Sequence, residues 1–403
     1  MAQVVLEVDE HLSQDDDIRG LDSKSLSASV LDYEYENGRR YHGYKAGHYP
    51  IPNDESELDR LDLQHHLLTT LLDGKLHLAP LKDPKKILDL GTGTGIWAID
   101  MADLYPDAIV IGTDLSPVQP QWVPDNVHFA IEDVESDWTY TEDSFDYIHI
   151  RLLIGAISDW SSLIRKAYSH LRPGGYVEVQ EIDPRMTSDD DSLHPDNISS
   201  VWSTLICEAS ENYGRPIPRA TEYKYWLEEA GFAEIRETIY KRPTNTWPKN
   251  KQLKEVGKFQ LVNYTEGLEG LSVGLFTRGL QWQPAEVQVL VAKVKTELKN
   301  KNIHSYQNLA VVYGRKPETA PPSRGAKSGR RSLPASRPAD KTASGAKSNA
   351  SPGKPNTSDI TLPYQAVRPL KAVQKGNIKY GHSNQAQPMG IPKSSYEKFE
   401  FPE

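Results

Sequence analysis

Three glycines at alternating positions constrain the fold of this chain more than any other feature. The stretch 87–95 reads ILDLGTGTG and leads into IWAIDMADLY, which predicts an apolar strand, a tight turn and a helix. Gly91, Gly93 and Gly95 leave no side chain between the backbone and a ligand that lies against the turn. A dinucleotide fingerprint would need glycine where Ile96 stands, and the Gly-Lys-Ser/Thr of a phosphate-binding loop is missing from this turn. The turn therefore predicts a different kind of cofactor.

Short apolar runs and longer amphipathic stretches alternate from residue 87 onward. This alternation predicts an α/β fold, with a parallel sheet and helices on both of its faces. The seven expected strands are 87–90, 109–113, 127–131, 145–150, 176–182, 233–240 and 305–313. The expected helices are 58–72, 96–104, 161–171, 201–209 and 221–230. Residues 251–300, which come before the last strand, are expected to form a helical insertion.

Acidic residues stand at the ends of the two strands that follow the glycine turn. Asp114 closes the strand at 109–113, and Asp133 follows the strand at 127–131. The carboxyl ends of parallel strands meet at one edge of a sheet, where ligands bind. A ribose diol needs a hydrogen-bond acceptor, and nucleotide-binding sheets place an acid about 20 residues beyond their glycines. Asp114 is therefore a candidate ribose acceptor.

The glycine turn, these acids and two later segments together resemble the Rossmann-like S-adenosylmethionine (SAM) methyltransferases. The later segments are FDYIHIRLL at 145–153 and LRPGGYVEVQ at 171–180. The resemblance implies a seven-stranded methyltransferase sheet, SAM as the cofactor and methyl transfer as the reaction. It places the glycine turn against the methionine part of SAM, Asp114 at the ribose and Asp133 beside the adenine amino group. The residues that it assigns to the cofactor are Asp89, Gly91, Thr92, Gly93, Gly95, Asp114, Leu115, Asp133 and Val134.

Five tyrosines stand within the segment 33–49, YEYENGRRYHGYKAGHY, ahead of the sheet. Aromatic faces attract cations such as the SAM sulfonium by roughly 0.5–2 kcal/mol, so this arm is a candidate lid. In this hypothesis Tyr33, Tyr41 and Arg151 close the cofactor site. The alternative is that the tyrosines only fasten the arm to the domain, and we give the two interpretations equal weight.

The same arm narrows the resemblance to one family. YENGRRYH, PNDESELDRLDLQHHLL, GLEGL and VVYGRK are similar to segments of the fungal LaeA-like methyltransferases, also called TAM-domain or UMTA-type proteins. The resemblance implies a SAM-dependent methyltransferase with an unidentified acceptor, acting in fungal secondary metabolism or regulating it. One alternative is a nuclear regulatory protein that acts through a protein complex, with weak or no activity on small molecules. Another is a SAM-binding module without chemistry.

Methyl transfer from a sulfonium is an in-line displacement, so the protein mainly supplies proximity and alignment, an effect that reaches roughly 7–11 kcal/mol. A protonated acceptor also needs a base. His42, His149 and Glu181 are candidates, and the sequence does not choose between them. We expect no metal site, because Cys207 is the single cysteine and the histidines at 65–66 have the spacing of packing or rim residues.

Composition divides the chain into three segments. We expect a disordered N-terminus at 1–30, a methyltransferase domain at 31–316 and a disordered basic tail at 317–403, which is rich in Pro, Ser, Ala, Gly and Lys. The expected parts of the domain are an arm and lid at 31–80, a cofactor-binding core at 87–185 and the helical insertion at 250–300.

Charge and hydropathy limit the expected partners. Residues 315–403 hold 16 basic and 6 acidic residues and carry +10, so residues 1–314 carry −20 of the total of −10. An acidic body does not neutralise phosphates, and we expect no nucleic-acid partner for the folded domain. We expect a small-molecule or protein methyl acceptor and protein partners of the tail. With neither a secretory leader nor a long apolar stretch, we expect a cytoplasmic and/or nuclear protein that is not secreted and has no membrane partner.

Overall fold

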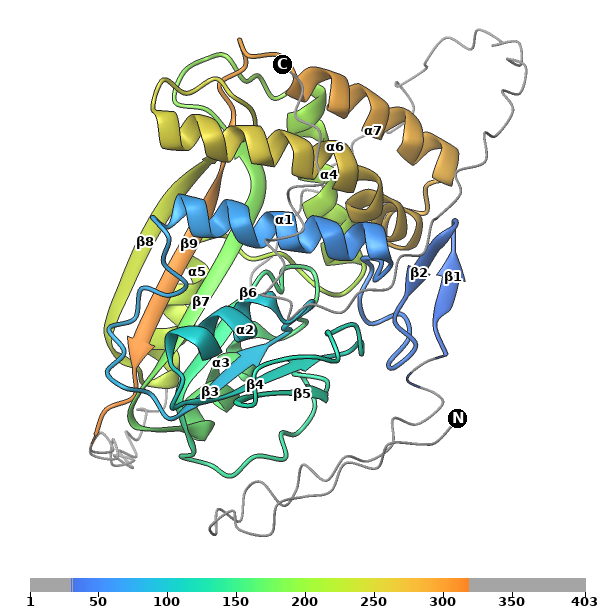
Figure 1. The fold of residues 1–403 in the computed structure, drawn as a ribbon. Coiled ribbons are helices and arrows are strands. Elements are labelled where there is room, and N and C mark those ends of the chain that lie inside the picture. Colours follow the sequence, from blue (N-terminus) through green and yellow to red (C-terminus); the bar gives the residue numbers. More distant parts are fainter. Residues whose placement is uncertain (1–29, 31, 319–403) are drawn as a thin grey trace, which may run out of the picture. The chain divides into compact units, whose positions relative to one another are not determined.

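The computed structural model describes Val30 and residues 32–318, and all the elements named below lie within this part of the chain (Figure 1). The disordered segments expected at 1–30 and 317–403 fall outside the described residues, apart from Val30, Pro317 and Glu318.

Seven strands form one sheet in the order β5-β4-β3-β6-β7-β9-β8. Neighbouring strands from β5 to β7 run parallel, whereas β9 runs antiparallel to both β7 and β8. The strands are β3 (Lys86–Leu90), β4 (Ile109–Asp114), β5 (Val127–Ile131), β6 (Phe145–Arg151), β7 (Leu171–Thr187), β8 (Ala233–Pro243) and β9 (Tyr306–Arg315). All seven expected strands are confirmed. The sheet is mixed rather than wholly parallel, because the chain turns back through the helical insertion between β8 and β9.

Helices cover both faces of this sheet, as expected. On one face, α3 and α5 share a hydrophobic core with Leu88, Ile148 and Val177. On the other, α2 covers Ile87 and Val110, and α1 and α6 lie side by side over the half that contains β7 and β9 (Figure 1). A further core joins α4 and α7 to α6. The helices are α1 (Glu55–Leu71), α2 (Ile96–Leu104), α3 (Trp160–His170), α4 (Ile198–Asn212), α5 (Glu222–Ala230), α6 (Lys251–Gly279) and α7 (Pro284–Leu298).

A short hairpin precedes the sheet and is absent from the expected elements. β1 (Glu34–Glu36) pairs antiparallel with β2 (Arg39–Tyr41). Asn37 and Gly38 connect them with φ values of 52° and 76°. Asn-Gly between two strands is a strong hairpin signal, because both turn residues need positive φ. The sequence therefore contained this information, in the same segment whose tyrosines suggested a lid.

The helix α6 continues through several glycines without a break. Glycine inside a helix costs about 1 kcal/mol relative to alanine, so these positions need another reason. A Cβ at Gly274 would lie 2.3 Å from the carbonyl oxygen of Pro50, and one at Gly267 would lie 2.2 Å from Cδ of Arg60. The two glycines thus allow the N-terminal arm and α1 to approach α6 closely.

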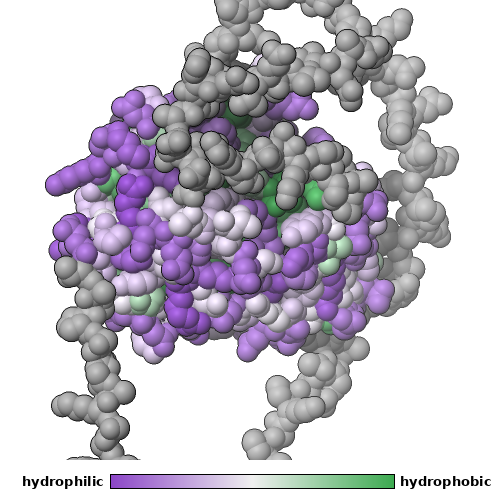
Figure 2. All heavy atoms as spheres, turned by 90° about the horizontal axis from the view of Figure 1, so that it is seen from below, coloured by the Kyte–Doolittle hydropathy of each residue, from purple (hydrophilic) through white to green (hydrophobic). Residues whose placement is uncertain are grey.

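The surface in Figure 2 is mostly hydrophilic, with hydrophobic residues in small separate patches. The large hydrophobic side chains that are exposed in the described part of the chain come from different elements: Tyr35, Leu104, Trp122, Tyr225, Ile239 and Val289. Single exposed side chains of this kind are normal for a folded domain. Within residues 32–318, every helix is too short or too polar to cross a membrane.

We predict that Gly274→Ala destabilises the protein although alanine favours helices. The added methyl group would meet the Pro50 carbonyl oxygen, and overpacking of this kind costs about 1–3 kcal/mol. Chemical denaturation measures the change. Glu266→Ala, at an exposed position of the same helix, is the matched control and should stay within about 0.5 kcal/mol of the wild type. A more stable Gly274→Ala variant would contradict the packing described here.

Candidate functional site

The glycine turn between β3 and α2 is fixed from behind by a buried carboxylate. Gly91 and Gly93 have φ values of 67° and 58°, which residues with a side chain rarely adopt. The Thr92 amide donates to the Thr113 carbonyl at 2.8 Å, and its hydroxyl donates to Asp89 Oδ2 at 2.6 Å. Asp89 is only 3% exposed. It therefore shapes the turn from the side opposite to the cavity described below.

Asp114 lies beside the turn, at the carboxyl end of the neighbouring strand. Its Oδ2 accepts the Gly93 N–H at 2.8 Å and its Oδ1 accepts the Ser116 N–H at 2.9 Å. Desolvation raises the pKa of Asp114 to about 6, although these N–H groups favour the ionised form. The carboxylate is thus largely ionised at neutral pH and poorly hydrated, which favours a ligand that brings hydroxyl donors.

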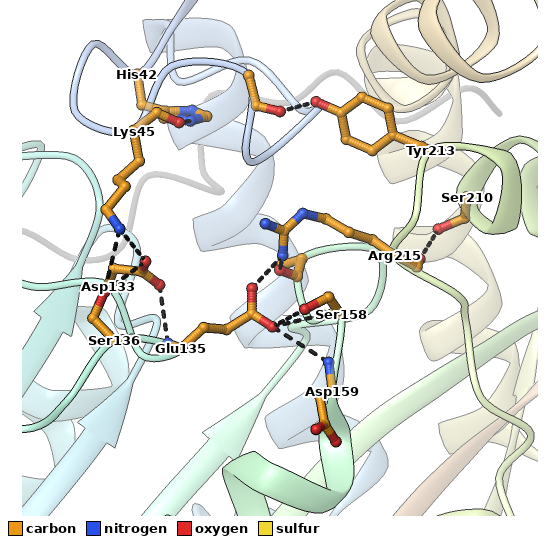
Figure 3. Close-up of polar contacts among 12 residues, drawn as sticks. His42, Lys45, Asp133, Glu135, Ser136, Ser158, Asp159, Ser210, Tyr213 and Arg215 are labelled. Atoms are coloured by element: carbon orange, nitrogen blue, oxygen red, sulfur yellow. Dashed lines mark hydrogen bonds and ion pairs between the residues drawn. The ribbon is translucent and has the colours of Figure 1, made fainter.

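Asp133 follows the next strand along the same edge of the sheet. It accepts the Glu135 N–H at 2.9 Å and the Ser136 hydroxyl at 3.0 Å, and it lies 3.0 Å from Lys45 Nζ (Figure 3). Burial works against ionisation of Asp133, but the Glu135 N–H and the Lys45 ammonium outweigh it and lower the pKa. The N-terminal arm thus reaches one of the predicted cofactor acids.

A cavity of about 1170 Å³, counting the part open to solvent, lies over this edge of the sheet. The turn, both acids and the N-terminal arm surround it. The predicted site residues that line it are His42, Gly91, Thr92, Gly93, Asp114, Leu115, Asp133, Val134 and Arg151. The structure therefore brings together three strand ends and an arm that are up to about 100 residues apart in sequence.

The predicted residues that do not line this cavity are Asp89, Gly95, Tyr33, Tyr41, His149 and Glu181. Gly95 is the N-cap residue of α2 and has a φ of 81°. A Cβ at this position would lie 2.4 Å from the Phe129 ring. Its role is to pack the turn against β5.

His149 is a core residue of β6. Its Nδ1 lies 2.7 Å from Asp89 Oδ1, and its ring stacks on Trp97 with 3.6 Å between centroids. Burial lowers the pKa of His149 to about 4, despite the opposing effect of Asp89. A neutral imidazole that donates to Asp89 supports the carboxylate behind the turn. His149 is thus placed to position Asp89.

Glu181 lies fully buried on β7, behind the end of β6. Its Oε1 accepts the Leu153 N–H at 2.7 Å, and burial raises the pKa of Glu181 to about 8. The preceding Leu152 has a φ of 59°, a strained value for a residue with a side chain. Glu181 therefore helps to hold a sharp turn whose residues Leu152 and Leu153 line the cavity.

The tyrosines of the arm divide between packing and the cavity. Arg278 of α6 lies over the Tyr41 ring at 5.0 Å, and burial raises the pKa of Tyr41 to about 12. Tyr33 carries the Arg40 guanidinium over its ring at 4.8 Å. Tyr49, which was not among the predicted site residues, lines the cavity together with His42. Tyr41 thus fastens the arm to α6, Tyr33 packs within the arm, and Tyr49 and His42 face the cavity.

Polar contacts join the N-terminal arm, the segment after β5 and the segment after α4 beside the cavity (Figure 3). The Tyr213 hydroxyl donates to the Gly47 carbonyl of the arm. Arg215 Nη1 pairs with Glu135 at 2.6 Å. Nothing in the sequence around Arg215 indicates this position, because it is set by the packing of α4 against the sheet.

The neighbouring histidines His65 and His66 lie in different surroundings. His65 lines the cavity and lies between Asp100 and Arg151. Its Nε2 lies 2.9 Å from Asp100 Oδ2, and its Nδ1 lies 3.0 Å from Nη2 of Arg151. His66 packs edge-on against Phe259. Among the described residues, no cluster of three or more His, Cys, Asp or Glu side chains is arranged to hold a metal ion.

Comparison with known proteins gives consistent results. Residues 63–237 match the family model described as a methyltransferase domain. The chain is 48% identical over 296 residues to the methyltransferase pytC of Aspergillus terreus, which covers 73% of this chain and 91% of that protein. It is 42% identical over 290 residues to the secondary metabolism regulator LAE1 of Cochliobolus heterostrophus, covering 70% and 94%.

A third relative extends this comparison. The chain is 40% identical over 288 residues to the protein-methionine methyltransferase laeA of Emericella nidulans, which covers 71% of this chain and 77% of that protein. The chain belongs to the LaeA-like family of class I methyltransferases, enzymes that use S-adenosylmethionine as their cofactor.

Proposed function

We propose that this methyltransferase binds SAM in the cavity at the ends of β3, β4 and β5 and methylates a small-molecule acceptor of fungal secondary metabolism. The observation that carries the proposal is the pairing of Asp114 with the Gly93 N–H, which joins the turn and the predicted ribose acceptor in one cavity. The names of pytC and laeA support the enzyme activity, and the name of LAE1 supports the link to secondary metabolism.

The residues of the cavity fit this cofactor. The Asp114 carboxylate accepts the Gly93 and Ser116 N–H groups through different oxygens and has lone-pair capacity left for a ribose hydroxyl. Gly91, Thr92 and Gly93 would lie against the methionine part, and Arg151 supplies a positive charge for its carboxylate. Asp133 and Val134 would face the adenine, with Lys45 moving aside from the Asp133 carboxylate. Asp89 and His149 act from behind as positioning residues.

SAM supplies an activated methyl group and a neutral thioether as leaving group. The protein aligns the acceptor and takes its proton where it has one. His42 is our candidate for that base, because it is the one of the three predicted bases that lines the cavity. Its Nε2 lies 3.1 Å from the Lys45 carbonyl, which can only accept, so Nδ1 keeps a free lone pair. Burial lowers the pKa of His42, which favours the neutral ring that a base requires.

A second candidate function is supported by the relatives named as regulators. In this alternative the chain acts in a nuclear complex, and the basic segment 317–403 recruits its protein partners. We favour the enzyme on small molecules because the lined, arm-covered cavity suits an acceptor that can be enclosed. Either function is compatible with a cytoplasmic and/or nuclear protein.

We predict that Gly93→Asp and Asp114→Ala abolish SAM and S-adenosylhomocysteine binding in isothermal titration. The wild type should bind with micromolar affinity, about −8 kcal/mol. Gly74→Asp and Asp146→Asn are the matched controls. Gly74 also has positive φ, and Asp146 also accepts two backbone N–H groups, but at the opposite edge of the sheet. A folded wild type that binds neither compound would refute the proposed site.

We predict that SAM affinity falls as the pH is lowered through 6. The pKa of Asp114 is raised to about 6, and only its ionised form accepts from both ribose hydroxyls. Affinity at pH 5 should be about ten-fold weaker than at pH 7. In titrations across this range, Asp114→Asn should bind weakly with a flat profile. An equally steep profile for that variant would assign the titration to another group.

We predict that removing residues 319–403 leaves SAM affinity within about two-fold of the full chain, because the cofactor residues lie in the described part. Titration of both forms tests this. The regulatory alternative predicts in addition that the shortened chain loses nuclear localisation and partner binding in cells. A shortened chain that is folded but cannot bind SAM would contradict the proposed division of the protein.

A further inference from the structure

A second cavity adjoins the proposed cofactor cavity. It encloses about 800 Å³, counting the part open to solvent, and lies between α1, α4, α6 and the ends of β7, β8 and β9. The two cavities share Tyr49, Ile51, Leu61 and Leu152 as common walls. The rest of its apolar lining is formed mainly by Ile182, Trp202, Ile206, Ile217, Leu271 and Leu275.

Two buried arginines also line this apolar cavity, and one of them is neutralised. Arg60 is 4% exposed. It donates to both carboxylate oxygens of Glu57, at 2.9 and 2.6 Å, and to the side-chain oxygens of Gln64 and Asn263 at 2.7 and 2.9 Å. All three guanidinium nitrogens of Arg60 therefore have acceptors, and its charge is balanced.

Arg242 of β8, 3% exposed, is not neutralised in this way. Its Nη2 donates to the Gln307 side-chain oxygen at 2.5 Å, while Nε and Nη1 have no acceptor among the residues that the structure describes. Burial is the main cause that lowers the pKa of Arg242. The nearby Tyr264 raises this pKa, and the positive charge of Arg60 lowers it further. Arginine nevertheless stays protonated in proteins, so a buried charge remains without a counter-ion.

Gln307 cannot supply the missing negative charge. Its amide nitrogen donates to the Pro184 carbonyl at 2.6 Å, which fixes the direction of the side chain. Its oxygen already accepts from Arg242 and from the Tyr264 hydroxyl. Arg242 is thus held in a set orientation by a neutral partner, in a cavity whose other walls are largely apolar.

We propose that Arg242 is the anchor for the methyl acceptor, and that the acceptor is a largely apolar small molecule with an anionic oxygen, a carboxylate or an ionised enol. This inference rests on the proposed function, because it takes the adjoining cavity as the cofactor site. Burial of a charge is costly unless it is paired, and the ligand's anion supplies the partner that the chain lacks. The apolar walls contact the rest of the ligand.

The position of Arg242 separates the anchoring group from the reacting atom. Arg242 lines only the second cavity, whereas Tyr49 lines both. In this proposal an acceptor bound to Arg242 extends toward the cofactor cavity along Tyr49, and the atom that receives the methyl group lies at that end. Burial raises the pKa of the Tyr49 phenol, which thus remains a hydrogen-bond donor at the junction.

The test compares matched carboxylates and amides as probes. Hexanoate is compared with hexanamide, and hydrocinnamate with hydrocinnamamide, by ligand-observed NMR titration of the full chain with S-adenosylhomocysteine. The wild type should bind each carboxylate at least about ten-fold more tightly than its amide. The ionised enol of dimedone, compared with its neutral methyl ether, distinguishes the two kinds of anion. A wild type without preference for anions would overturn the proposal.

Two variants and a control assign the preference to Arg242. Arg242→Met removes the charge and should abolish the preference. Gln307→Glu keeps Arg242 but supplies an internal carboxylate, so this variant should also lose the preference for carboxylates. It decides the question if Arg242→Met does not fold. Arg172→Met, which removes an arginine paired with Asp146, is the control and should keep the preference. Preference that persists in Gln307→Glu would count against the proposal.

The experiment distinguishes loss of cofactor binding from loss of the anion preference. If S-adenosylhomocysteine does not bind, the proposed function fails, and the same probe comparison on the protein alone still decides whether Arg242 binds anions. A preference for carboxylates without cofactor binding would keep the anion site and remove its role as an acceptor anchor.

Discussion

The buried carboxylate of Asp89 is the contact on which the candidate site depends. It accepts the Thr92 hydroxyl through one oxygen and faces His149 through the other, so it links the glycine turn to β6. The turn holds its positive φ values because it is fixed from behind, and its Gly93 N–H can then meet Asp114. A buried carboxylate is stable only when such partners surround it, and the sheet register supplies them.

The N-terminal arm connects the two cavities. Its docking on α6 requires the absence of a side chain at Gly274, where the Pro50 carbonyl approaches the helix. The preceding residue, Tyr49, lines both cavities. Lys45 and Gly47 hold the arm through Asp133 and the Tyr213 hydroxyl. Because the same segment lines both cavities, movement of the arm would affect both of them together.

The two cavities differ in charge, which gives each a different selectivity. The proposed cofactor cavity presents Asp114 and Asp133, which suit hydroxyl and amino donors, and Arg151, which suits a carboxylate. The second cavity contains Arg60 and Arg242, of which only the first is neutralised by a carboxylate. In the proposed arrangement the two cavities would orient their ligands relative to each other, because each ligand would pay a desolvation penalty in the other's place.

The sequence alone determined the strand segments and the glycine turn with Asp114, because these depend on local periodicity and on motif spacing. The family resemblance added the cofactor and Asp133 as a site candidate. It also contained the Asn37–Gly38 turn, an unused signal for the hairpin. Only the tertiary structure separated Asp89 and His149, behind the turn, from the residues that line the cavity. Only the tertiary structure, too, placed Arg242 beside Tyr264 and Gln307 without a carboxylate. Charge compensation depends on which distant side chains pack together, and no local pattern records that.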